Sequence, residues 1–171
     1  MNVSNVPDFE STRSLPKPEF VARHPGLFLI FSARSGAGMG FKTTVATLDE
    51  MEANEAVNVD TINDIGAEVL ALTKAPGNPY SERISLGRAR NCDLVLRDAS
   101  VSKLHAHFLC LPNGGFELAD LDSQNGTLVD GRPLKAHVAV AVSVGSALRF
   151  GAVVAHLVDA PRLYDLLEFS E

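Results

Sequence analysis

The stretch from Arg83 to Lys103 contains several side chains that can bind an anion. It holds five basic and two acidic residues, a local net charge of +3 in a chain whose formal net charge is −6. Arg88 offers a planar guanidinium that suits phosphate, Lys103 a mobile charge and Ser102 a short hydroxyl donor. These residue types, brought together, predict a local site for a compact, doubly charged anion such as a phosphate group.

Ser102 and His105 also have a spacing that suggests a nucleophile and its base. The sequence shows neither a third group to orient the imidazole nor donors for an oxyanion hole, so we expect no enzymatic activity. His105 and His107 are two residues apart and could share one face of a strand, but a metal site needs further ligands. We therefore expect structural histidines, with neither a metal nor another cofactor.

Tight turns in the second part of the chain indicate the elements that must position these residues. Asn125-Gly126 and Asp130-Gly131 are pairs that favour two-residue turns, because Gly tolerates positive φ and Asn or Asp bonds the local backbone. Short apolar runs alternate with such turns and predict strands at residues 69–72, 83–87, 94–96, 106–111, 116–119, 127–129, 138–142, 147–150 and 153–158. Many short strands separated by turns predict an all-β sandwich or barrel.

The order and spacing of these motifs resemble those of the forkhead-associated (FHA) domain family. The matching motifs are Gly87-Arg88, residues 91–96, Ser102 with His105, and residues 123–127, followed by a similar segment at 144–151. The likeness covers residues 67–158. It implies an FHA-type β-sandwich of about 11 short strands, and a signalling module that binds phosphothreonine peptides in a Ser/Thr kinase pathway.

The resemblance also implies which residues form the site. Arg88, Ser102 and Lys103 match the family's phosphate contacts, and Gln124 and Asn125 match positions that hold the bound peptide. Structural support of the binding loops is implied for Gly87, His105, Gly126, Thr127 and Gly131.

Three positions depart from the family pattern. Lys103 stands where Arg is usual, Gln124 where Thr is usual, and Asp130 where a second Asn is usual. Lys103 keeps the charge but loses the planar fork, so we expect a modest loss of affinity. Asp130 would repel phosphate if its carboxylate pointed toward the binding rim.

The remaining parts of the chain divide into three segments. Residues 1–18 are rich in Ser, Asn, Pro and charge, which predicts a disordered tail. Residues 19–66 form an N-terminal α/β extension of uncertain structure, with a helical turn at 20–24 and a buried strand at 27–31. After the domain at 67–158, residues 159–171 are predicted to form a C-terminal helix with Asp159 as its N-cap.

The extension holds four further patterns. Residues 36–43 are rich in Gly, but Phe41 precedes Lys42 where a phosphate loop needs Gly, so a connecting loop is favoured over a nucleotide site. Thr47 and Glu50 have the spacing of a capping box, while residues 57–60 alternate like a strand. The acidic run Asp49, Glu50, Glu52 and Glu55 is expected to be a solvated face, and the alternative is an internal pseudo-ligand for the basic segment.

Composition narrows the classes of function. The acidic charge argues against binding nucleic acid or an anionic membrane. The first residues lack a signal core, and Cys92 and Cys110 fit buried reduced thiols, so we expect a cytoplasmic protein. The expected partner is a phosphothreonine-containing protein, a Ser/Thr protein kinase or its substrate. The alternative is a phosphate-independent interaction or scaffold module on the same sandwich.

Overall fold

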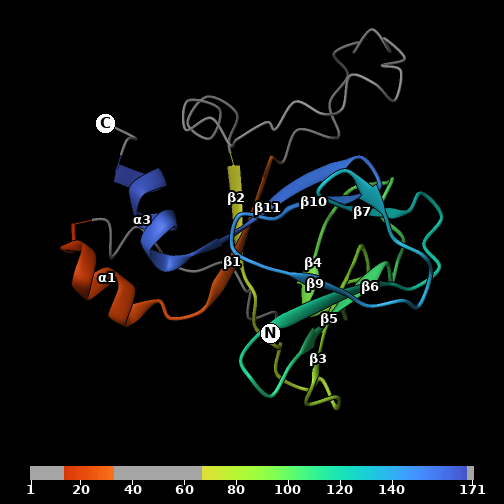
Figure 1. The fold of residues 1–171 in the computed structure, drawn as a ribbon, viewed down its shortest axis with the longest axis horizontal. Helices are drawn as coiled ribbons and strands as arrows, with labels where there is room; N and C mark the ends of the chain where they lie inside the picture. Colours follow the sequence, from red (N-terminus) through yellow and green to blue (C-terminus); the bar gives the residue numbers. More distant parts are fainter. Residues whose placement is uncertain (1–13, 33–66, 169–171) are drawn as a thin grey trace, which may run out of the picture.

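The computed structural model describes residues 14–32 and 67–168. Within these stretches two helices accompany eleven strands, which form two sheets (Figure 1). The fold is therefore the predicted all-β sandwich with a short C-terminal helix. The strand predicted at 27–31 as part of an N-terminal extension lies inside the larger sheet.

The larger sheet has six strands in the order β2-β1-β11-β10-β7-β8. These strands are β2 (Ala67–Ala71), β1 (Leu27–Ser32), β11 (Val153–Asp159), β10 (Ala147–Phe150), β7 (Thr127–Val129) and β8 (Arg132–Pro133). Each neighbouring pair is antiparallel. The register of β1 against β2 sets Ser32 opposite Ala67, so these two residues lie on adjacent strands.

The smaller sheet has five strands in the order β4-β3-β5-β6-β9. They are β4 (Leu94–Val95), β3 (Arg83–Gly87), β5 (Ala106–Cys110), β6 (Phe116–Asp120) and β9 (Val140–Val142). β3 and β4 are parallel, and the other pairs are antiparallel. Consequently the end of β3, the start of β5, the end of β6 and the start of β7 all lie at one end of the sandwich.

The main core lies between the two sheets. Alternate side chains point inward, because successive residues of a strand face opposite sides of its sheet. Leu29, Leu148 and Phe150 come from the larger sheet, while Leu86 and Phe108 come from the smaller one, and all five are almost fully buried. Burying each such side chain contributes about 1.5–3 kcal/mol.

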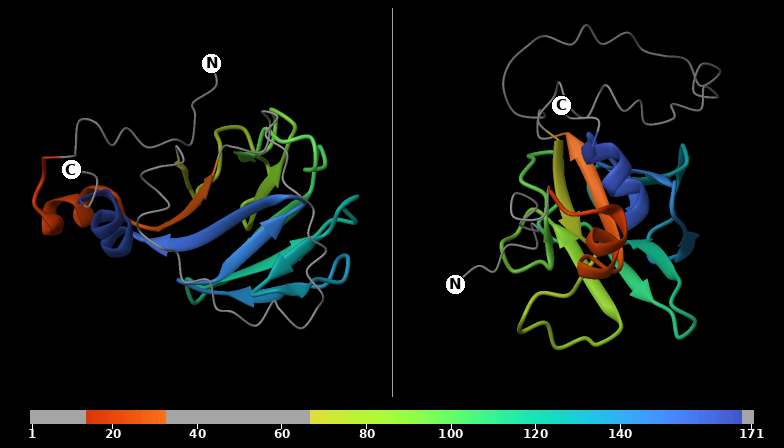
Figure 2. Two further views of the ribbon diagram at one scale, coloured as in Figure 1. Left: turned by 90° about the horizontal axis from the view of Figure 1, so that it is seen from above. Right: turned by 90° about the vertical axis from the view of Figure 1, so that its left-hand side faces the viewer.

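Two helices cover part of the outer face of the larger sheet. α1 (Lys17–Arg23) and α3 (Ala160–Glu168) lie side by side over β1 and β11 (Figure 2). A second apolar cluster fills the space beneath them, comprising Phe20, Phe28, Ile30, Val158, Ala160, Leu163 and Tyr164. Asp159 caps α3 as predicted, since its Oδ1 accepts the N–H of Arg162 at 3.1 Å.

The strand predictions for residues 83–87, 127–129 and 147–150 match the strands in full, and the other predicted strands have slightly different bounds. β9 begins at Val140 instead of 138, because His137 has a φ of 63° and Val138 closes a turn onto Lys135. β8 was not predicted, since it has only two residues and one of them is Pro133, which suits an edge strand.

The N-terminal prediction also needs a correction. α1 begins at Lys17, inside the segment 1–18 predicted as a disordered tail and three residues before the helical turn predicted at 20–24. Pro18 occupies the first turn of α1, where its missing N–H has no helical partner to lose.

The division into residues 1–18, 19–66, 67–158 and 159–171 stays a prediction. The glycine-rich stretch 36–43, the capping box 47–50, the acidic run 49–55 and the strand 57–60 lie outside the described residues.

Candidate functional site

Three loops meet at the end of the sandwich where β3 ends. They are residues 88–93 after β3, residues 97–105 before β5, and residues 121–126 between β6 and β7. Arg88, Lys103, Gln124 and Asn125 are exposed there, and Ser102 is half-buried. The fold therefore brings all five predicted contact residues to one end of the molecule.

The first two loops are joined through their backbones. The N–H of Arg88 donates to the carbonyl of Ser102 at 2.9 Å, and the N–H of Ala89 donates to that of Lys103 at 3.0 Å. Gly87 precedes this junction, and a Cβ there would lie within 3.0 Å of the Lys103 carbonyl. Only glycine permits so close an approach without moving a loop, which is the reason for a glycine before Arg88.

His105 connects the second loop to the third. Its side chain is fully buried. Nδ1 accepts the backbone N–H of Ser102 at 3.0 Å, so the ring proton must be on Nε2, which donates to the carbonyl of Gly126 at 3.0 Å. Burial lowers the pKa of His105, despite the opposing effects of the Gly126 hydrogen bond and of Asp120, so the imidazole is neutral.

The same geometry argues against a nucleophile at Ser102. His105 bonds the backbone of Ser102 and not its hydroxyl, while Ser102 Oγ accepts the N–H of Gln124 at 3.1 Å. Both ring nitrogens of His105 are occupied by the backbone, so the imidazole cannot take a proton from the hydroxyl.

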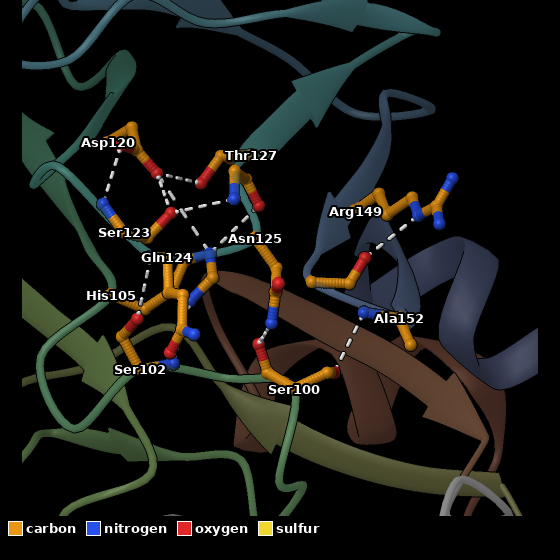
Figure 3. Close-up of polar contacts among 12 residues, drawn as sticks. Ser100, Ser102, His105, Asp120, Ser123, Gln124, Asn125, Thr127, Arg149 and Ala152 are labelled. Atoms are coloured by element: carbon orange, nitrogen blue, oxygen red, sulfur yellow. Dashed lines mark hydrogen bonds and ion pairs between the residues drawn. The ribbon is translucent and has the colours of Figure 1, made fainter.

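Asp120 organises the third loop and was missed by the sequence analysis. Its carboxylate accepts Ser123 Oγ at 2.5 Å, Thr127 Oγ1 at 2.6 Å and the N–H of Ser123 at 3.0 Å (Figure 3). Burial alone would raise the pKa of Asp120, but these hydrogen bonds and His105 outweigh it, and the pKa is lowered. An available signal was the Asp-x-x-Ser spacing of Asp120 and Ser123, which is typical of a side chain capping its own turn.

Ser100 is a second residue that the sequence analysis missed. Asn125 Nδ2 donates to the Ser100 carbonyl at 2.8 Å, and Ser100 Oγ accepts the N–H of Ala152 at 2.8 Å. Gly151 lies against it with a φ of 60°, where a Cβ would come within 3.0 Å of the Ser100 carbonyl. The turn between β10 and β11 thereby joins the binding end, next to Asn125 (Figure 3).

Asp130 and Gly131 lie at the opposite end of β7 from this site. They form the turn between β7 and β8, with φ values of 49° and 77°. Asp130 Oδ1 accepts the N–H of Ala147 at 2.8 Å, so the carboxylate is held at that turn. The concern that Asp130 faces the binding rim is thus removed, and Gly131 shapes a distant turn instead of touching the binding loops.

Neither Cys92 nor Cys110 forms a disulfide. Cys92 is buried, and its Sγ donates to the Lys103 carbonyl. Cys110 is only half-buried, in contrast to the expectation that both cysteines are buried. Within residues 14–32 and 67–168, no group of three or more His, Cys, Asp or Glu side chains is placed to hold a metal ion. In the same residues, no helix is long and apolar enough to cross a bilayer.

Comparison with known proteins identifies the class of domain. The family model of the FHA domain matches residues 84–151, which include all three binding loops. Residues 84–151 thus match the FHA domain, as the sequence motifs predicted.

Two curated relatives are similar over longer stretches. A protein phosphatase 1 regulatory inhibitor subunit PPP1R8 homolog of Arabidopsis thaliana is 34% identical over 113 residues, 61% of this chain. This chain spans only 29% of the length of that plant protein. An oxoglutarate dehydrogenase inhibitor of Corynebacterium diphtheriae is 28% identical over 124 residues, 67% of this chain and 84% of the relative.

Solved FHA domains are also similar in structure. The FHA domain of the CT664 protein from Chlamydia trachomatis is 28% identical, covers 57% of this chain and 89% of its own, and has a TM-score of 0.45. The N-terminal FHA domain of S. cerevisiae Rad53p, in complex with a phosphothreonine peptide, is 19% identical, with coverages of 57% and 88% and a TM-score of 0.46.

Proposed function

We propose that this end of the sandwich binds a phosphothreonine residue of a partner protein that a Ser/Thr protein kinase has phosphorylated, and that the protein signals by this docking without catalysing a reaction. The observation that carries the proposal is the convergence of Arg88, Ser102 and Lys103 on two loops joined by backbone hydrogen bonds. Phosphothreonine carries nearly two negative charges and several acceptor oxygens, which suits such a set of donors.

Arg88 and Ser102 are held in states that suit a phosphate. The Nε–H of Arg88 donates to the Val101 carbonyl at 3.1 Å, which orients the guanidinium. The residue is exposed, so its terminal N–H groups can reach a phosphate. Ser102 Oγ already accepts a hydrogen bond from Gln124, so its own proton is available for a phosphate oxygen. Lys103 adds a charge that adjusts to the ligand.

Asn125 is suited to hold the backbone of the same peptide. Its Nδ2 donates to the Ser100 carbonyl, so the side-chain oxygen remains as an acceptor for a peptide N–H. Gln124 lies beside it with an exposed side chain. Both curated relatives have names that describe inhibitors of other proteins, which supports a regulatory and non-enzymatic role.

Isothermal titration with a library of phosphothreonine peptides tests the proposal. Arg88→Ala removes a charge-assisted contact worth about 1.5–3 kcal/mol, so binding should weaken roughly tenfold to a hundredfold. Arg132→Ala, on exposed β8, removes the same side chain at the other end of β7 and should leave affinity unchanged. If the wild type binds no peptide of the library, the proposal fails.

A pull-down separates this function from the phosphate-independent alternative. Partners captured from a lysate should be lost after phosphatase treatment of the lysate and lost again with Arg88→Ala. Capture that survives both changes would favour a scaffold module that uses another surface.

A further inference from the structure

A short turn at residues 98–101, in the loop before β5, contacts two of the side chains that the proposed function assigns to the ligand. The carbonyl of Ser100 accepts Asn125 Nδ2 at 2.8 Å (Figure 3). The carbonyl of Val101, the next residue, accepts the Nε–H of Arg88 at 3.1 Å. Two consecutive carbonyls of one turn therefore orient a peptide contact and a phosphate contact.

Asp98 holds this turn in shape. Its Oδ1 accepts the backbone N–H of Ser100 at 2.8 Å and the Ser100 hydroxyl at 2.6 Å, and its carbonyl accepts the N–H of Val101 at 3.1 Å. Asp is favoured at the first position of such a turn, because its side chain can bond the backbone two residues on. Both N–H groups at the end of the turn are thus bonded to Asp98.

The contact between Ser100 and Asn125 depends on the orientation of one peptide unit. The Ser100 carbonyl and the Val101 N–H belong to the same planar, trans peptide unit, so they point in opposite directions. Because the N–H points at Asp98, the carbonyl is directed away from Asp98 and toward Asn125. The shape of the turn around Asp98 therefore sets the direction in which Asn125 is held.

The contact to Arg88 depends on the next peptide unit instead. That unit carries the Val101 carbonyl and the N–H of Ser102, which donates to His105 Nδ1 at 3.0 Å. His105 therefore orients the carbonyl that holds Arg88, just as Asp98 orients the carbonyl that holds Asn125. The phosphate contact and the peptide contact are set by two different side chains.

The amide of Asn125 needs such support, because Asn125 is exposed. Within residues 14–32 and 67–168, the Ser100 carbonyl is the one hydrogen-bond partner of its side chain. A side chain that is already oriented loses less conformational freedom when a ligand binds, which strengthens binding.

We propose that Asp98 is a positioning residue, which orients the amide of Asn125 through the peptide unit between Ser100 and Val101 and so presents the Asn125 side-chain oxygen to the backbone of the bound peptide. This inference rests on the proposed function, because it concerns a contact beside the phosphothreonine.

A double-mutant cycle, titrated with one phosphothreonine peptide, tests the inference. Asp98→Ala should weaken binding roughly threefold to tenfold, a size typical of coupling between hydrogen-bonded residues. With Asn125→Ala already present, the same substitution should change affinity less than about twofold, since the side chain that it orients is gone. With Arg88→Ala present, its effect should persist in full. A residue that only stabilises the fold would have the same effect in both backgrounds.

Two further variants serve as controls. Asp98→Asn removes the charge but keeps a side-chain oxygen for Ser100, so it should restore the affinity that Asp98→Ala loses. Removing a negative charge would by itself favour phosphate, so the charge cannot explain a weakening. Asn113→Ala breaks a turn of the same kind at the opposite end of the sandwich, where Asn113 Oδ1 accepts the N–H of Gly115 at 2.9 Å, and should leave affinity unchanged.

Ser100→Ala is a milder variant for the case that Asp98→Ala is too unstable to titrate. It loses the hydroxyl contact to Asp98 but keeps the N–H contact, so it should weaken binding less and lose its effect with Asn125→Ala. Wild-type affinity of Asp98→Ala and Ser100→Ala, or equal losses in both backgrounds, overturn the inference but not the proposed function. If the wild type binds no phosphothreonine peptide, both fail.

Discussion

Both ends of the sandwich consist of the loops and turns that connect its strands, but the two ends differ in how these loops are held by hydrogen bonds. At the end opposite the binding loops, Asn113 accepts the N–H of Gly115 and Ser146 accepts that of Ser143, each within one turn. At the binding end, the side chain of His105 joins two separate loops. At that opposite end Asp130 reaches only the adjacent strand, at the N–H of Ala147. The difference teaches that the binding surface depends on a buried side chain that joins two loops, whereas the other turns are held within themselves or to the next strand.

This comparison predicts that substitutions at the binding end propagate, while those elsewhere stay local. The largest effect is expected for His105→Ala. It leaves the Ser102 N–H and the Gly126 carbonyl without their partner and opens a cavity, which should cost about 3 kcal/mol of unfolding free energy. Urea denaturation measures the loss, and peptide titration should show that binding disappears with it.

His137 provides the matched control for His105. It is an exposed histidine at φ 63°, a conformation that Asn tolerates well. His137→Asn should change stability by no more than about 0.5 kcal/mol and leave binding intact. Equal effects of the two substitutions would break the proposed distinction between the regions.

Substitutions at two glycines, one at each end of the sandwich, are expected to have effects of intermediate size on stability. Gly87→Ala forces a Cβ against the Lys103 carbonyl, which should cost about 1–3 kcal/mol and displace the loop that carries Lys103. Gly114→Ala meets no atom within 4 Å but has a φ of 83°, so only backbone strain of about 1 kcal/mol is expected. Denaturation measures both costs, and only Gly87→Ala should also weaken peptide binding; unchanged binding would contradict the role given to Gly87.

The smallest expected effect is a dependence of stability on pH. Burial lowers the pKa of His105 and, elsewhere, of His24 and His107 below the ordinary value of 6.5. The unfolded chain therefore binds more protons than the folded chain as the pH falls below 6.5, and stability falls with it.

Denaturation midpoints measured between pH 8 and pH 5 test this expectation. His105→Gln should flatten the curve in part, because His24 and His107 remain. A wild-type stability that stays constant or rises on acidification would show that the imidazole of His105 is not held neutral.

Local signals were sufficient to predict most strands and the loops of the site. Asn125-Gly126 and Asp130-Gly131 specify turns from two adjacent residues, so the strand between them follows directly. Arg88, Ser102 and Lys103 could be chosen from their chemistry and from the family motifs, and the fold brings their loops together. Whether these side chains contact phosphate stays a prediction.

Contacts between distant segments could not be predicted in the same way. Asp120 bonds Thr127 across a loop, and Ser100 meets Asn125 and Ala152 from three parts of the chain. No periodicity in the sequence indicates that these distant residues form hydrogen bonds with one another. Asp130 shows the converse, because a residue close to the motif in sequence lies at the far end of a strand in space.

The pairing of Ser32 with Ala67 has a consequence for how this chain can vary. Ser32 and Ala67, the residues that flank 33–66, lie opposite each other on adjacent antiparallel strands. A short hairpin turn could connect two strands in this arrangement. Each doubling of the length of a connection costs only about 0.6 kcal/mol in closure entropy. Insertions and deletions between these two strands can therefore accumulate during evolution at little thermodynamic expense, while the register of the sheet stays the same.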